Sequence, residues 1–182
     1  CRPTGAGPKD PKAFLCEPGE RGVQKQGLAS GTYYLNPFSD EVRVVSRQSL
    51  RLDLGTAGRI KFPSNDGFDI TLSGTVEWSL KDSEVPLVFV KFGGTEGAEK
   101  KLLLPAARAK SRLQGSRKPA AEFISGATRQ TFQDEFAKDL RTVAEAEGVR
   151  IHSVLISGIV PADEIAKPIR EREISLLERE QY

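Results

Sequence analysis

The clearest pattern in this chain is a strict alternation of apolar and polar residues over residues 68–80. The apolar positions, from Phe68 to Leu80, fall on one face, and Asp, Thr, Ser and Glu fall on the other. Successive side chains of a β-strand point to opposite faces, so this alternation predicts a strand with one buried face and one wet or partnered face. Leu50, Leu52 and Leu54 repeat the pattern and predict a shorter, half-buried strand.

Further apolar runs predict additional strands. Residues 32–35 and 42–45 are β-rich, and an Asn-Pro turn at residues 36–37 separates them. Residues 85–92 predict a strand next to residues 68–80, followed by a flexible glycine-rich loop over residues 92–97. Residues 149–160 are rich in β-branched side chains and predict a strand covered on both faces.

Helical spacing dominates the region from residue 102 onward. A short helix is predicted over residues 102–113, with Pro105 tolerated near its start. The main helix is predicted over residues 119–147, with its apolar stripe on the sheet face that carries Trp78. The stripe consists of Ile124, Thr128, Phe132, Phe136, Leu140 and Val143. Trp78, Phe132 and Phe136 are therefore our candidates for the core.

The order of elements in residues 148–172 is the most informative feature of the chain. Gly148 closes the main helix, the apolar strand follows, and Pro161 ends that strand because proline cannot donate to a sheet ladder. Asp163 and Glu164 then favour the first turn of a new, very polar helix. Such a helix has little apolar surface of its own and needs partner helices or a longer coiled coil.

This order, together with the glycine-tyrosine pattern GVQ…G-YYLNP near the start, resembles the SPFH or Band 7 superfamily. That superfamily includes the stomatins, prohibitins, flotillins and HflK/HflC proteins. The resemblance implies an α+β fold: a curved, mostly antiparallel sheet packed with helices, followed by the start of a long charged exit helix.

The resemblance also suggests a division of the chain. We expect a Pro/Gly-rich leader over residues 1–12, an SPFH domain over residues 13–160 and the start of a coiled-coil helix over residues 161–182. Within the domain, a β-rich half spans about residues 13–66 and an α+β half spans about residues 67–160.

The function implied by the resemblance is that of a non-enzymatic, membrane-associated scaffold. Such a protein oligomerises into a ring or cage, organises a membrane microdomain and regulates membrane proteins such as proteases. Self-association would use the domain flanks and the exit helix, where Arg170, Arg172 and Glu173 are our candidate contacts.

No apolar run in the chain approaches the roughly 20 residues that a membrane span requires. The chain contains no methionine and stops within a predicted helix, so we expect native sequence to be missing at both ends. The membrane anchor is then expected in an N-terminal segment outside this sequence. The domain could face either side of the membrane.

The formal net charge of +2 is too small to indicate a dedicated nucleic-acid binder. One basic run stands out and could attract anionic lipid headgroups. It consists of Arg108, Lys110, Arg112, Arg117 and Lys118. The alternative is a solvated helix face whose charge is balanced elsewhere. No aromatic residues are interleaved with these cations, which disfavours RNA.

Catalytic candidates are weak. His152 is the single histidine, so no two-histidine metal site is possible, and no G-x-S-x-G nucleophile motif occurs. The glycine loops at residues 55–58 and 93–97 lack the continuation of a phosphate-binding motif. Asp66 and Asp69 flank a turn and are at best weak metal ligands. We therefore expect no catalytic, cofactor or metal site.

The two cysteines leave one alternative open. Cys1 and Cys16 could form a disulfide, although nothing in the sequence supports one. Cys1 could instead carry a lipid, as cysteines beside membrane segments do, or merely mark where the sequence begins.

Two other classes of function compete with the scaffold. One is a monomeric adaptor domain that binds lipid or protein. The other is an enzyme, which would lose its turnover on substitution of His152 or Asp66.

Overall fold

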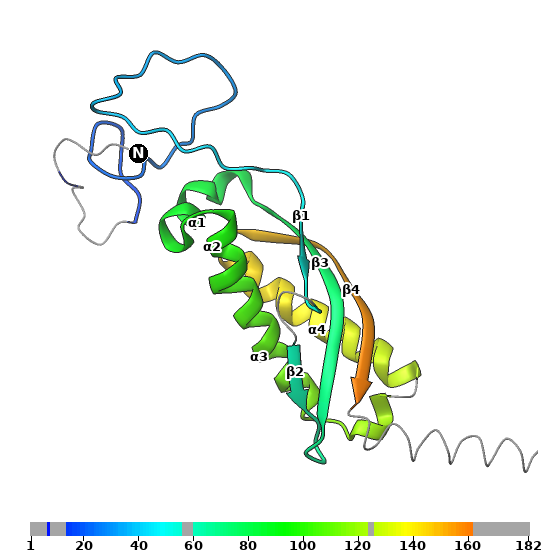
Figure 1. Cartoon of the computed structure of the whole chain (residues 1–182). Helices are drawn as coiled ribbons and strands as arrows, with labels where there is room; N and C mark the ends of the chain where they lie inside the picture. Colours follow the sequence, from blue (N-terminus) through cyan, green and yellow to red (C-terminus); the bar gives the residue numbers. More distant parts are fainter. Residues whose placement is uncertain (1–6, 8–13, 56–59, 124–125, 162–182) are drawn as a thin grey trace, which may run out of the picture.

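The computed structural model describes residue 7 and residues 14–55, 60–123 and 126–161 (Figure 1). Its elements follow one another as a group of strands, a helical region and a last long strand. The strands are β1 (Leu50–Asp53), β2 (Ile60–Pro63), β3 (Asp69–Leu80) and β4 (Val149–Pro161), and the α-helices are α1 (Val85–Phe92), α2 (Thr95–Ala98), α3 (Leu104–Gly115) and α4 (Gly126–Ala146).

The sheet is built around β3, and all its pairings are antiparallel. β1 and β2 pair with successive parts of one edge of β3, and β4 pairs with the other edge along its whole length. α3 and α4 lie against one face of this sheet, as Figure 1 shows. The predicted α+β class, with an antiparallel sheet packed with helices, is confirmed.

β3 confirms the alternation read from the sequence. Its side chains at even positions, from Ile70 to Leu80, are buried, while those at odd positions are exposed or half-buried. Phe68, which the pattern places on the buried face, lies just before the strand and is exposed. β3 is buried on one face because the helices cover a single side of the sheet.

β4 corrects the prediction of a strand covered on both faces. Leu155 and Val160 point outward and are exposed, whereas Ile151, Ile156 and Ile159 are buried. The register against β3 shifts twice, once near Ser157 and once near His152, so that two residues of β4 oppose one of β3. Such bulges interrupt the alternation of inward and outward side chains. The apolar run of β4 therefore lacks a regular period of two, and its sequence suggested burial on both faces.

α1 is a second correction, because residues 85–92 form a helix and not the predicted strand. Pro86 lies in its first turn, and Gly93 ends it with a left-handed φ of 88° and donates its amide to Phe89 O over 2.8 Å. Proline at the start and glycine just past the end are the normal helix signals. The predicted flexible loop is also partly wrong, because residues 95–98 form the helical turn α2.

The two long helices confirm the helical predictions with shifted ends. α3 begins after a π-helical turn at Glu99–Leu103, and its Pro105 lies in the first turn. The predicted main helix is divided into a 3₁₀ turn at Ala120–Phe123 and the helix α4. The stripe residues Phe132, Phe136 and Leu140 are buried, and Ile124 lies outside the described residues.

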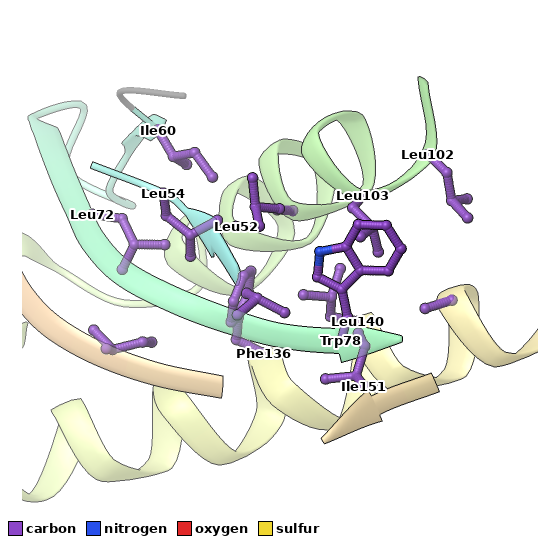
Figure 2. Packing of buried hydrophobic residues seen from close by; sticks show 14 of the residues in the cluster. Leu52, Leu54, Ile60, Leu72, Trp78, Leu102, Leu103, Phe136, Leu140 and Ile151 are labelled. Carbon is purple, nitrogen blue, oxygen red and sulfur yellow. The ribbon is translucent and has the colours of Figure 1, made fainter. Parts of the chain in front are cut away.

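The core fills the space between the sheet and these helices. Figure 2 shows Trp78 pointing from β3 toward the helices, close to Leu103 and Leu140. Trp78, Phe132 and Phe136 are all buried, as predicted, and Phe132 stacks on Phe62 of β2 with ring centroids 5.4 Å apart. Among the described residues, no acceptor lies within hydrogen-bonding distance of the buried Trp78 Nε1.

Residues 14–48 form no named strand, which corrects the prediction of strands at residues 32–35 and 42–45. An isolated bridge joins Cys16 and Gln24 within this segment. The predicted Asn-Pro turn does form, since Asn36 O accepts the amides of Ser39 and Asp40. In Figure 1 this segment loops away from the sheet, beyond the end that carries α1.

Candidate interaction surface

A strong concentration of positive charge lies on α3 and on the residues just before and just after it. We call this the basic surface, and it consists of Lys100, Lys101, Arg108, Lys110, Arg112, Arg117 and Lys118. Residues 100–118 contain no Asp or Glu. Because the whole chain carries +2 and this segment carries +7, the rest of the chain carries −5.

Helix geometry separates the cations from the face that packs on the core. Ala107, Ser111 and Gly115 repeat every four residues and are buried, while Arg108 and Arg112 occupy the exposed face. Lys110 lies at the border and is half-buried. The small residues on the inner face therefore allow a close approach to the core, and the long basic side chains remain in water.

Two contacts fix the orientation of α3. Gly115 lies against the ring of Phe62, where an added Cβ would come within 2.1 Å of the ring, so only glycine fits without movement. Gln114 is buried and donates from Nε2 to Asp139 Oδ2 of α4 over 2.7 Å. The exposed face of α3 is thus held in one direction by packing on β2 and by a polar link to α4.

Ion pairs lie at both ends of the basic surface. Lys100 lies 3.9 Å from Glu96, and Lys118 lies 3.8 Å from Glu122, and the partners of each pair are four residues apart in sequence. Among the described residues, neither Lys110 nor Arg112 has an ion-pair partner. The centre of the surface therefore keeps its positive potential and is able to attract an anionic partner.

The sequence predicted the centre of this surface and missed its start. All five predicted cations lie on or next to α3, and the structure adds Lys100 and Lys101 in the preceding turn. The signal was present, because no acidic residue separates Lys101 from Arg108. It was overlooked because an apolar run of three leucines and a proline divides the two groups in sequence.

His152, the candidate base, lies on the exposed face of β4. Its Nε2 is 2.9 Å from Ser79 Oγ of β3. On the same face, Glu77 accepts hydrogen bonds from Ser49 (3.1 Å) and Ser153 (3.4 Å). These contacts join neighbouring strands across the surface of the sheet, which is a structural role for His152.

Asp66, the second catalytic candidate, anchors the turn between β2 and β3. It accepts hydrogen bonds from the Ser64 hydroxyl and from the Ala120 amide, the latter over 3.0 Å. The Ser64 hydroxyl is the main cause that lowers the pKa of Asp66, with the amides of Ala120 and Asp66 itself in support, although desolvation acts in the opposite direction. The carboxylate thus joins the sheet to the turn before α4.

Comparison with known families identifies the chain. The family model described as the SPFH domain / Band 7 family matches residues 15–182. This chain belongs to the SPFH family. A search of the curated proteins finds no match. SPFH proteins are generally non-enzymatic, membrane-associated scaffolds, and the resemblance predicted from the sequence is confirmed.

Several predicted sites of the SPFH domain lie outside the described residues. These are the exit-helix contacts Arg170, Arg172 and Glu173, and the candidate lipidation site Cys1. Cys16 is described, and it is a buried free thiol that lies 3.2 Å from Arg21 O.

The described part of the SPFH domain offers neither a metal cluster nor a membrane-spanning helix. Within residues 14–55, 60–123 and 126–161, no group of three or more His, Cys, Asp or Glu side chains could hold a metal ion. None of the described helices has the length and apolar character needed to cross a membrane.

Proposed function

We propose that this chain is the SPFH domain of a scaffold that assembles with copies of itself and organises a membrane microdomain. The observation that carries the proposal is the family match over residues 15–182. Family members are generally membrane-associated and self-associating. An apolar anchor N-terminal to this sequence would hold the protein at the membrane, as the resemblance implies.

The surroundings of the two catalytic candidates support a role without chemistry. His152 faces solvent on the sheet and bonds to Ser79, and Asp66 accepts hydrogen bonds from Ser64 and Ala120. Each side chain therefore has a structural task that links two segments of the fold. A general base would instead face a substrate from within a cleft.

Assembly would work through many weak contacts that reinforce one another. Each contact between neighbouring domains or exit helices needs little affinity, because linked contacts raise the effective concentration of the next. A closed ring or cage of this kind encloses a membrane patch and controls access to it. A membrane protease is the enclosed partner that the family resemblance suggests.

The test is the mass of the full-length native protein in mild detergent, measured by light scattering. We expect a large closed oligomer. Charge reversal of Arg170→Glu and Arg172→Glu should reduce its mass, because both residues belong to the helix proposed to bundle. The single change Arg150→Glu, at an exposed position on β4 outside the exit helix, is the control and should leave the mass unchanged.

A monomeric full-length protein would overturn the scaffold. The adaptor domain would then become the leading function, and the basic surface is the observation that favours it. The wild type could form a large oligomer whose mass the exit-helix variant does not reduce. That result would assign the contacts between subunits to the domain flanks and not to Arg170 and Arg172.

A further inference from the structure

The basic surface is a strongly charged patch that the scaffold function does not use. Seven cations lie within nineteen consecutive residues, and no carboxylate is placed among them. The rest of the chain is net acidic, so the cations do not follow from the overall composition. Three small residues and Gln114 are buried on the inner face of α3, and Arg108 and Arg112 lie on its exposed face.

From this arrangement we infer that the exposed face of α3 binds the headgroups of an anionic lipid membrane. Arg108 and Arg112 are both exposed and four residues apart, which places them one turn apart on the same side of α3. Leu113, the residue after Arg112, is also exposed, by 47%. Cations gathered on an exposed helix face are the kind of cluster that attracts the headgroups of anionic lipids.

The alternative partner would be an acidic face on a second copy of the chain. The exposed face of α4 does not provide one, because Asp134 and Glu135 alternate there with Lys138 and Arg141. A mixed face offers little net attraction to seven cations. A lipid surface containing phosphatidylserine presents a dense layer of negative charge, and each Lys or Arg near it gains about 1 kcal/mol.

The inference rests on the membrane association in the proposed function, and it does not need self-assembly. The test is therefore binding of the 182-residue chain to vesicles by co-sedimentation. Phosphatidylcholine vesicles that contain phosphatidylserine should bind the chain, and vesicles of phosphatidylcholine alone should not. Added salt should release it, because the attraction is screened within about 8 to 10 Å at physiological ionic strength.

The decisive variant is the double change Lys110→Gln and Arg112→Gln, since neither side chain has an ion-pair partner among the described residues. Its affinity for the anionic vesicles should fall about 30-fold, from about 1 kcal/mol for each cation removed. The control is Lys138→Gln with Arg141→Gln, which makes the same charge change on α4. The control should bind nearly as well as the wild type.

Three results would overturn the inference. One is a wild-type chain that ignores anionic vesicles. Another is an equal loss of binding in both double variants, because that would reflect total charge and not the basic surface. The third is a lipid-free chain that self-associates and becomes monomeric in the Lys110→Gln, Arg112→Gln variant, which would assign the surface to a second copy. The detergent mass of the full-length protein tests assembly separately, so failure of one proposal leaves the other intact.

Discussion

β3 and residues 30–48 both contain many β-branched and aromatic side chains, yet only β3 becomes a strand. β3 has β1 and β2 on one edge and β4 on the other, and its buried face rests on the helices. Residues 30–48 have no ladder partner among the described residues, and Tyr34 and Val44 are almost fully exposed (102% and 95%). The difference shows that β-branched and aromatic side chains favour a strand only where a neighbouring strand and a buried face are available. Their β-propensity does not by itself produce a strand.

Hydrogen exchange should show the largest contrast between the two regions. Amides in the middle of β3, such as that of Val76, should exchange through global unfolding, with a protection of about 5 to 15 kcal/mol. Amides of Tyr34 and Val44 should exchange at nearly the rate of an unfolded chain. Mass spectrometry of peptic fragments measures both. Comparable protection in residues 32–45 would mean that this segment pairs with another strand in solution.

Truncation of aromatic side chains should give the next largest difference. Phe132→Ala should lower the free energy of unfolding by about 3 to 5 kcal/mol, because it removes a buried ring that stacks on Phe62. Tyr34→Ala in the exposed segment should change it by about 0.5 kcal/mol or less. Urea unfolding followed by circular dichroism gives both values. A costly Tyr34→Ala would contradict the exposure seen here.

Two glycines allow a smaller, matched comparison. Gly115→Ala should destabilise the protein by about 1 to 3 kcal/mol, because the new methyl group collides with the ring of Phe62. Gly27→Ala is the control, since nothing lies within 4 Å of its added Cβ, and it should be neutral to within about 0.5 kcal/mol. Thermal unfolding of the two variants and the wild type measures both changes in stability. Equal stability would show that α3 can move away from β2.

The smallest expected effect concerns pH. The pKa of Asp66 is lower in the folded chain than its unfolded value of about 3.9. A lowered pKa means that Asp66 stabilises the fold above the unfolded pKa and loses this contribution as the pH falls through the folded pKa. The wild type should therefore be more stable than Asp66→Asn at neutral pH, and the gap should close in acid. A gap independent of pH would assign the effect to shape instead of charge.

Sequence reasoning succeeded where one element satisfied a single strong rule. The alternation over residues 68–80 identified β3 and the buried Trp78, and the helical stripe identified Phe132 and Phe136. In the basic surface, the sequence identified the cations of α3, whose charge needs no tertiary context to be recognised. It missed Lys100 and Lys101, because an apolar run separates them from Arg108 in sequence, and the structure places them in the turn that leads into α3.

The failures share one cause, which is that short apolar runs fit more than one structure. Residues 85–92 are eight residues long, within the range of both a strand and a helix, and Pro86 and Gly93 decided for a helix. In β4, the two bulges replaced the regular alternation with inward residues three apart, such as Ile156 and Ile159. Neither register shift leaves a recognisable mark in the sequence.

By itself, the sequence determined the family, the α+β class, the central strand and the concentration of positive charge on α3. These follow from patterns that each segment carries alone, namely side-chain period and charge. Only the tertiary structure decided that residues 85–92 form a helix, that residues 32–35 form no strand and that Leu155 of β4 is exposed. Those outcomes depend on which segments lie close enough to form hydrogen bonds and apolar contacts. The fold as a whole decides which segments lie close to one another.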